Sequence, residues 1–166
     1  MISRRLFLLA GSAGLAAAAF PSLFPPVTPA AAESFPVTKS DAEWKAQLSD
    51  AQYQILRHED TERPFTSALN HEKRAGTFHC VGCDQALYDS SKKFDSGTGW
   101  PSFWDARPKA IGTREDGSFG MVRTECHCSR CGGHLGHIFN DGPQPTGMRH
   151  CINGEILTFR PGETPA

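Results

Sequence analysis

Two groups of apolar residues between residues 40 and 58 are spaced as on one face of a helix. Each group follows a capping-box pattern, a serine followed three residues later by glutamate or glutamine, starting at Ser40 and at Ser49. The apolar residues are Trp44 and Leu48 in the first group and Tyr53, Ile55 and Leu56 in the second. Pro64 disfavours helical backbone in the residue before it, which indicates a break near Arg63. The pattern therefore predicts two short helices.

The texture of the chain changes after residue 77. Glycine and proline recur every few residues, and between them lie short apolar or aromatic clusters at 77–81, 119–124, 135–139 and 156–159. Short apolar runs between turn residues are typical of strands in an antiparallel arrangement. We therefore expect a mainly β domain, built as a small antiparallel sheet system and preceded by short helices.

The first 32 residues differ in composition from the rest. Arg4 and Arg5 precede an apolar run that ends near Phe20, and small residues follow at 30–32. The run is shorter than the roughly 20 apolar residues of a membrane span, which argues against a transmembrane helix. An uncleaved membrane anchor is the alternative. The paired arginines favour a twin-arginine signal peptide at 1–32 and a mature domain at 33–166. Such a leader predicts a periplasmic protein with no stable membrane insertion after cleavage.

The length and net charge of the chain limit the classes of function that it can have. A chain of 166 residues, part of it a leader, has room for one domain of modest core. The formal net charge is −1 at pH 7, and no stretch forms a basic stripe. The sequence therefore argues against nucleic acid as a partner.

Four of the six cysteines form two CxxC pairs, Cys80 with Cys83 and Cys128 with Cys131. Two such turns give tetrahedral sulfur coordination, which favours one structural zinc ion; iron is the other metal that suits four sulfurs. Disulfides and a redox-active CxxC are the alternatives, and the oxidising compartment that an exported protein enters favours disulfides. Twin-arginine export carries folded cargo, so zinc bound before export would protect the thiolates. We therefore predict a structural zinc site.

Cys151 is the candidate for chemistry. It follows Arg149, and a nearby guanidinium favours the thiolate, which is the reactive form of cysteine. A buried cysteine that acts as a small apolar residue is the alternative, and residues 149–153 alone leave the two readings open.

Four segments together resemble the type B methionine sulfoxide reductases, which reduce the R epimer of methionine sulfoxide. They are Thr-Glu-Arg-Pro-Phe-Thr at 61–66, Phe-Asp-Ser-Gly-Thr-Gly-Trp-Pro-Ser-Phe at 94–103, the block at 128–139 with His-Leu-Gly-His, and Gly-Met-Arg-His-Cys-Ile-Asn at 147–153. They occur in the family's order and span nearly all of the predicted mature chain. The resemblance implies a zinc-bearing fold of two antiparallel sheets, with the nucleophile on a strand that faces an open cleft.

The resemblance also implies roles for particular residues. Cys151 attacks the sulfoxide sulfur and becomes a sulfenic acid, while His134 and His137 hold water and supply the proton. Trp100 packs against the substrate methyl group. The other expected participants are Asn153, which orients the network, Arg149, which tunes or positions Cys151, and Asp141, which helps through a hydrogen bond.

The sulfenic acid must then be reduced by a second thiol. Many relatives carry that resolving cysteine between the two glycines of the Gly-x-Gly-Trp-Pro block, where this chain has Thr98. Cys126 is the remaining thiol, and we take it as a possible resolving residue. The alternatives are an external thioredoxin-like thiol, a buried and unused Cys126, or a static disulfide that silences Cys151.

These inferences predict a zinc-stabilised enzyme that repairs oxidised proteins under oxidative stress. Its partners are oxidised protein or peptide methionine and an external thiol. A hypothesis from a different class is a non-catalytic zinc-stabilised β module that binds a ligand in the same cleft. Cys151 together with His134 and His137 discriminates between the two, because a binding module has no reason to combine them.

Overall fold

The computed structural model describes residues 33–162, except for the side chain of Phe119. Ser34 and the residues after it belong to one compact unit, which contains every element discussed below. The predicted signal peptide at 1–32 lies outside the described residues. Among the described residues, none of the helices has the length and apolar character needed to cross a membrane.

The two predicted helices are confirmed. They are α1 (Asp41–Gln47) and α2 (Asp50–His58), and both begin with a complete capping box. Ser40 accepts from the N–H of Glu43 and Ser49 from that of Gln52. The side chains of Glu43 and Gln52 accept from the serine N–H groups in return, so two donors at each helix start are satisfied. Helix α2 ends earlier than Pro64 requires, at a left-handed Glu59 with φ of 60°.

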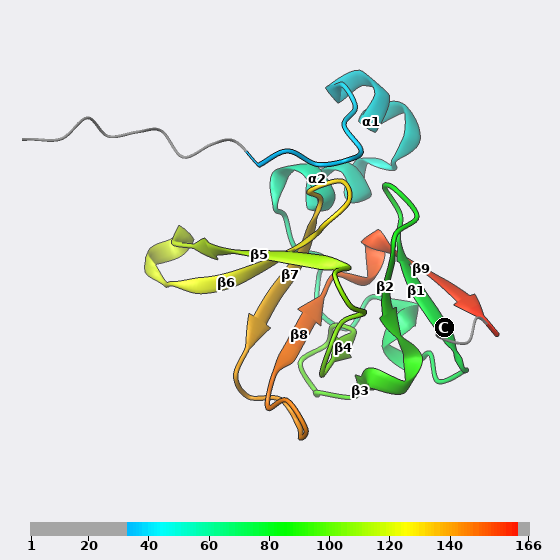
Figure 1. Ribbon diagram of the computed structural model, residues 1–166, viewed down its shortest axis with the longest axis vertical. Helices are drawn as coiled ribbons and strands as arrows, with labels where there is room; N and C mark the ends of the chain where they lie inside the picture. Colours follow the sequence, from blue (N-terminus) through cyan, green and yellow to red (C-terminus); the bar gives the residue numbers. More distant parts are fainter. Residues whose placement is uncertain (1–32, 163–166) are drawn as a thin grey trace, which may run out of the picture. The chain divides into compact units, whose positions relative to one another are not determined.

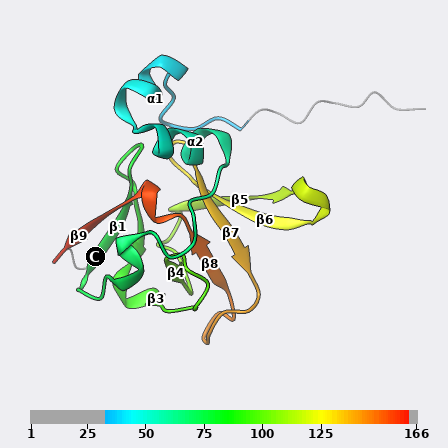
Figure 2. The same ribbon diagram turned by 180° about the vertical axis from the view of Figure 1, so that it is seen from behind.

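Two antiparallel sheets make up the rest of the fold, and the helices lie at one end of them (Figures 1 and 2). The three-stranded sheet has the order β2-β1-β9, and its strands are β1 (Gly76–Cys80), β2 (Ala86–Asp89) and β9 (Leu157–Pro161). The six-stranded sheet has the order β3-β4-β8-β7-β6-β5. Its strands are β3 (Lys93–Phe94), β4 (Ser102–Phe103), β5 (Ile111–Asp116), β6 (Arg123–Cys128), β7 (His134–Phe139) and β8 (Arg149–Ile152). The predicted fold class is confirmed.

Individual strands were predicted less well. The cluster at 119–124 is wrong as a strand, because a short 3-10 turn, η3 (Ser118–Gly120), occupies its start and β6 begins only at Arg123. Gly120 has φ of 70°, which breaks extended backbone there. Strands β2 and β5 were not predicted: β2 has only four residues, and β5 has a large apolar residue only at its first position.

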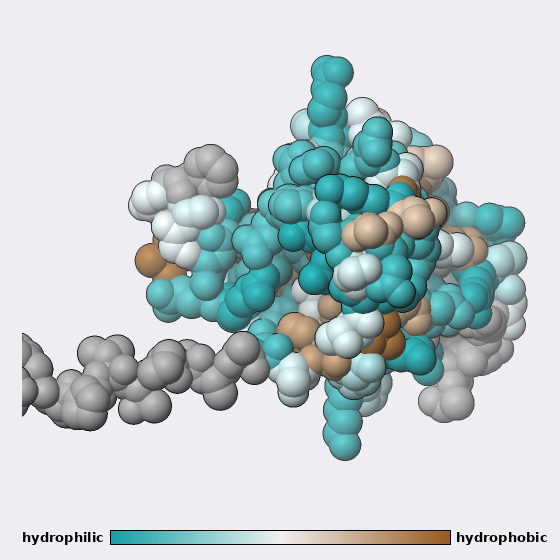
Figure 3. All heavy atoms as spheres, turned by 90° about the horizontal axis from the view of Figure 1, so that it is seen from above, coloured by the Kyte–Doolittle hydropathy of each residue, from teal (hydrophilic) through white to brown (hydrophobic). Residues whose placement is uncertain are grey.

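The core lies between the two sheets. The ring of Tyr88, from β2, stacks on that of Phe103, from β4, with ring centres 4.3 Å apart, and Phe78, from β1, packs edge-on against Phe103 at 5.0 Å. All three side chains are fully buried. In contrast, the surface on the side of the helices is mostly hydrophilic, with apolar atoms in small separate areas (Figure 3).

The close approach of β7 and β8 sets the geometry of the six-stranded sheet. A Cβ atom at position 136 would lie 2.0 Å from the carbonyl oxygen of Cys151, so only glycine fits there. Gly136 pairs with Ile152 and His137 with Cys151. Because neighbouring residues of a strand point to opposite faces, His137 and Cys151 share one face of the sheet.

Candidate active site

A cavity of about 130 Å³ opens on that face. Its lining consists of Thr61, Trp100, Arg123, Gly136, His137, Phe139, Cys151 and Asn153. Four of the predicted site residues, Cys151, His137, Trp100 and Asn153, are therefore brought together. Cys151 is half-buried, so its sulfur borders the cavity without being sealed from solvent.

Opposing effects act on the Cys151 thiol. Burial is the largest, and it raises the pKa of Cys151 above its ordinary value. The charge of Arg149 and hydrogen bonds from Thr98 and Arg149 lower the pKa but do not cancel the burial. The effect of Arg149 on the pKa has the direction expected from the sequence, but the net pKa is raised, so the resting residue is a thiol at neutral pH.

Arg149 is fixed by a carboxylate and a ring. Its Nε and Nη2 donate to Oδ1 and Oδ2 of Asp141, both at 2.9 Å, and its guanidinium lies 4.4 Å from the ring centre of Phe139. A bidentate pair of this kind gives the guanidinium one orientation. Asp141 thus acts on Cys151 through Arg149, while its own charge raises the pKa of the thiol.

His134 lies behind the cavity wall, 2 % exposed, with its ring centre 5.4 Å from that of His137. Its Nδ1 donates to Glu125 Oε1 at 2.8 Å, since an ionised carboxylate only accepts. Its Nε2 is buried and has no hydrogen-bond partner among the described residues. This leaves one ring nitrogen of His134 available to a bound water or substrate.

Glu125 was not predicted as a site residue. Burial raises its pKa, but hydrogen bonds from His127 and His134 and the charge of Arg114 outweigh burial and hold the pKa at about 2. The ionised carboxylate therefore stays in place to orient His134. In the sequence Glu125 is one acid among many, and only the register of β6 against β7 reveals its role.

Asp116 holds the second histidine in the same way. His137 Nε2 donates to Asp116 Oδ2 at 2.7 Å, and Arg123 Nη2 donates to the same oxygen at 2.6 Å. Hydrogen bonds from Ser118, then from His137 and Arg123, keep the pKa of Asp116 well below its usual range. Burial lowers the pKa of His137, and Asp116 offsets only part of that effect, so the ring is neutral at pH 7.

Asn153 and Trp100 are positioned through Glu62. Asn153 Nδ2 donates to the carbonyl of Leu135 at 3.1 Å, and its Oδ1 accepts from the N–H of Glu62 at 3.0 Å. The indole N–H of Trp100 donates to the carbonyl of Glu62 at 3.0 Å. The polar atoms of Asn153 are thus used by backbone, so this residue orients the wall of the cavity.

Cys126 lies on the other side of the same sheet. It pairs with Gly136, whereas Cys151 pairs with His137, so the two sulfurs point to opposite faces. Cys126 is fully buried beside the hydroxyl of Tyr88 at 3.5 Å, and burial raises its pKa to about 12. This geometry opposes the hypothesis that Cys126 resolves Cys151 within the folded domain.

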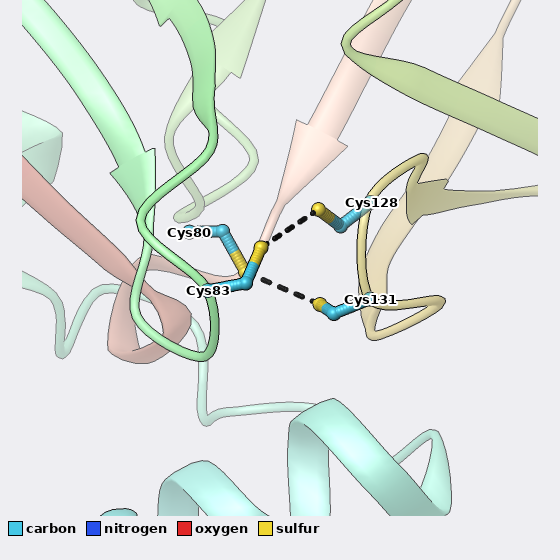
Figure 4. A group of neighbouring side chains, drawn as sticks. All are labelled: Cys80, Cys83, Cys128 and Cys131. Carbon is cyan, nitrogen blue, oxygen red and sulfur yellow. Dashed lines mark hydrogen bonds between the residues drawn. The ribbon is translucent and has the colours of Figure 1, made fainter. Parts of the chain in front are cut away.

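The four cysteines of the CxxC pairs converge at the junction of the two sheets (Figure 4). Their Sγ atoms lie within 4.8 Å of one another, with Cys80 and Cys131 3.8 Å apart and Cys83 and Cys128 3.5 Å apart. A tetrahedral ion with metal–sulfur bonds of about 2.3 Å requires sulfurs about 3.8 Å apart. All six cysteines are free, so no disulfide competes for these sulfurs. The donor set fits a metal ion.

The N-terminal helices close one side of this cluster. Gln47, from α1, donates to the carbonyl of Gly82 at 2.8 Å, and Arg57, from α2, donates to that of Cys131 at 3.1 Å. These bonds tie each cysteine turn to a helix. The cluster thus joins two sheets and the helical segment, as a structural site does.

Comparison with known proteins agrees with this geometry. Residues 48–161 match the family model described as the SelR domain. The chain is 53% identical to the peptide methionine sulfoxide reductase MsrB of Pseudomonas putida (strain W619) over 126 residues, which cover 75% of this chain and 95% of that protein. It is 51% identical to MsrB of Agrobacterium fabrum, again over 75% of this chain and over 93% of the relative. The chain therefore belongs to the SelR domain family, that of the type B methionine sulfoxide reductases.

Proposed function

We propose that this protein is a peptide-methionine (R)-S-oxide reductase that uses Cys151 as its nucleophile. The observation that carries the proposal is the pairing of Cys151 with His137 across β7 and β8, at the edge of a cavity also lined by Trp100. The relatives that are about 50% identical to this chain are named as peptide methionine sulfoxide reductases, and the similarity covers nearly their whole length. Reduction of oxidised methionine in proteins is thus the function that the site supports best.

The reaction leaves a sulfenic acid on Cys151. The Cys151 thiolate attacks the sulfoxide sulfur while the oxygen, twice protonated, departs as water. Water then adds to the Cys151 sulfur and releases methionine with its electron pair. In total a thiol and a sulfoxide become a sulfenic acid and a thioether, so the Cys151 sulfur loses two electrons and the methionine sulfur gains them.

The two histidines relay protons to the departing oxygen: the ring nitrogen that no carboxylate holds takes up a proton from water and then passes it on. An oxide is a poor leaving group, so the reaction needs an acid within hydrogen-bond reach of it. His134 presents its Nε2 because Glu125 holds the Nδ1, and His137 stands across the sheet from Cys151. Trp100 provides an apolar wall for the methyl group, and Arg149 stabilises the thiolate once the substrate displaces water.

An external thiol regenerates the enzyme. Thr98, which contacts Cys151 through its hydroxyl, cannot form a disulfide, and Cys126 is behind the sheet. Two thiols of a thioredoxin-like partner reduce the sulfenic acid to a thiol, with a disulfide and water as the other products. A non-catalytic binding module remains a hypothesis that no observation favours, because it needs neither a half-buried thiol nor the histidines.

An epimer-resolved assay tests the activity. With dithiothreitol as donor, we expect turnover of peptide-bound methionine-R-sulfoxide and none of the S epimer. Cys151→Ser should lower kcat by about 10³-fold or more, since it removes the nucleophile. Cys126→Ala is the matched control and should retain turnover. A folded wild-type protein that reduces neither epimer would contradict the proposal.

The charges around Cys151 predict opposite shifts in its titration. Arg149→Gln removes a cation that lowers the pKa of Cys151, so the midpoint of the thiol titration should move to higher pH. Asp141→Asn removes an anion that raises the pKa, so the midpoint should move to lower pH. The pH dependence of Cys151 alkylation by iodoacetamide measures both. Equal midpoints in the three proteins would refute this electrostatic account.

The mature protein is proposed to be periplasmic and to carry zinc. The paired arginines before the apolar run at 6–20 support export through the twin-arginine route, and the four-sulfur cluster supports zinc bound before export. Protein purified from the periplasm should begin near residue 33 and contain about one zinc ion per chain. An uncleaved protein in the membrane fraction would disprove cleavage and release into the periplasm, and zinc far below one equivalent would disprove the metal assignment.

A further inference from the structure

Phe65 is an apolar side chain without a place in the core. It is 71 % exposed, and the other large apolar residues that the described part of the chain exposes are Met121 and Val122. Burying an aromatic side chain stabilises a fold more than burying almost any other. The exposed ring of Phe65 therefore contributes little to the free energy of folding.

The backbone at Phe65 is strained as well. Its φ is 66°, and it follows Pro64 in a turn whose third position normally takes glycine because of that positive φ. Hydrogen bonds hold the conformation: the N–H of Phe65 donates to the carbonyl of Gly99 at 2.7 Å, and Asn70 donates to the same oxygen at 2.9 Å. Residues strained in this way cluster at active sites and ligand-binding sites.

The neighbouring loop is shaped to receive the ring. Gly99 has φ of 96°, and a Cβ atom there would lie 2.9 Å from Cδ2 of Phe65 and 2.8 Å from its backbone nitrogen. The glycine thus allows the two loops to lock together. The ring of Phe65 therefore lies against the backbone of Gly99, the residue before Trp100.

A second cavity, of about 160 Å³, opens beside Phe65. We call it the flanking groove; its apolar lining includes Phe65, Phe94 and Trp100. Trp100 also lines the cavity that contains Cys151, so the two cavities share a wall. Lys93 and Asp95 lie at the groove with opposite charges, and Lys93 is already bound to the carbonyl of Asn70. Asn70 and His71 complete its polar lining, and the three aromatic rings are the surfaces that favour an apolar side chain there.

We propose that the flanking groove binds an apolar residue of the polypeptide next to the methionine sulfoxide, with Phe65 as its outer wall. This inference rests on the proposed function. Continuity through Trp100 is the argument for such an occupant, because a chain that inserts its oxidised methionine beside Cys151 continues over Trp100 into the groove. A free methionine sulfoxide has no such neighbour and does not reach Phe65.

The test compares Phe65→Gly with wild type on three substrates. They are N-acetyl-methionine-R-sulfoxide, a heptapeptide with leucine on both sides of methionine-R-sulfoxide, and the same peptide with serine in place of the leucines. Glycine accepts the positive φ at position 65, so the variant keeps its fold, which circular dichroism and the melting temperature verify. Phe65→Tyr keeps the ring and serves as the conservative variant. Val122→Ala is the matched control for loss of an exposed apolar side chain.

We expect Phe65→Gly to raise KM for the leucine peptide about fivefold or more, with kcat unchanged. KM for the N-acetyl compound should stay the same, the serine peptide should change little, and Phe65→Tyr and Val122→Ala should match wild type. Equal effects of Phe65→Gly on all three substrates, no effect on any, or a loss with Val122→Ala of the same size would overturn the inference. A wild type inactive on every substrate would instead remove the proposed function itself.

Discussion

The pairing of β7 with β8 is the constraint on which the site depends. At Gly136 the two strands approach so closely that no side chain fits above the carbonyl of Cys151. That approach fixes the register, and the register places His137 opposite Cys151, the proposed nucleophile. A slip by one residue would send Cys151 into the core and bring His150 to the cavity, because the side-chain period of a strand is two. The geometry of the proposed site is therefore set first by the pairing of the backbone strands and only then by the side chains.

The alternation of side chains along the strands also places the cysteine sulfurs in different environments. Cys151 borders a cavity, Cys126 is sealed beneath the sheet against Tyr88, and four others gather where the sheets meet. Each environment sets the chemistry of its thiol. Burial raises the pKa of both thiols, but at Cys151 the charge of Arg149 opposes that effect. Position thus distinguishes the one sulfur proposed to react from the other five.

Local signals in the sequence predicted local structure well. The capping boxes at Ser40 and Ser49 gave both helices, since caps depend on three neighbouring residues, and the CxxC spacing gave the cluster. The strand at 119–124 failed because Gly117 and Gly120 turn the chain there. Glu125 and Asp116 could not be found from the sequence, because each becomes a partner of a histidine only through strand pairing. The net rise in the pKa of Cys151 was also out of reach, since burial is a tertiary effect.

The fate of oxygen after one turnover tests most directly whether Cys151 works alone. The wild-type protein receives one equivalent of peptide methionine-R-sulfoxide without any reductant, and dimedone then traps sulfenic acid before peptide mapping by mass spectrometry. We predict a dimedone adduct on Cys151 and free Cys126, because the sheet separates their sulfurs. A disulfide between Cys126 and Cys151, formed as fast as methionine is released, would contradict this account.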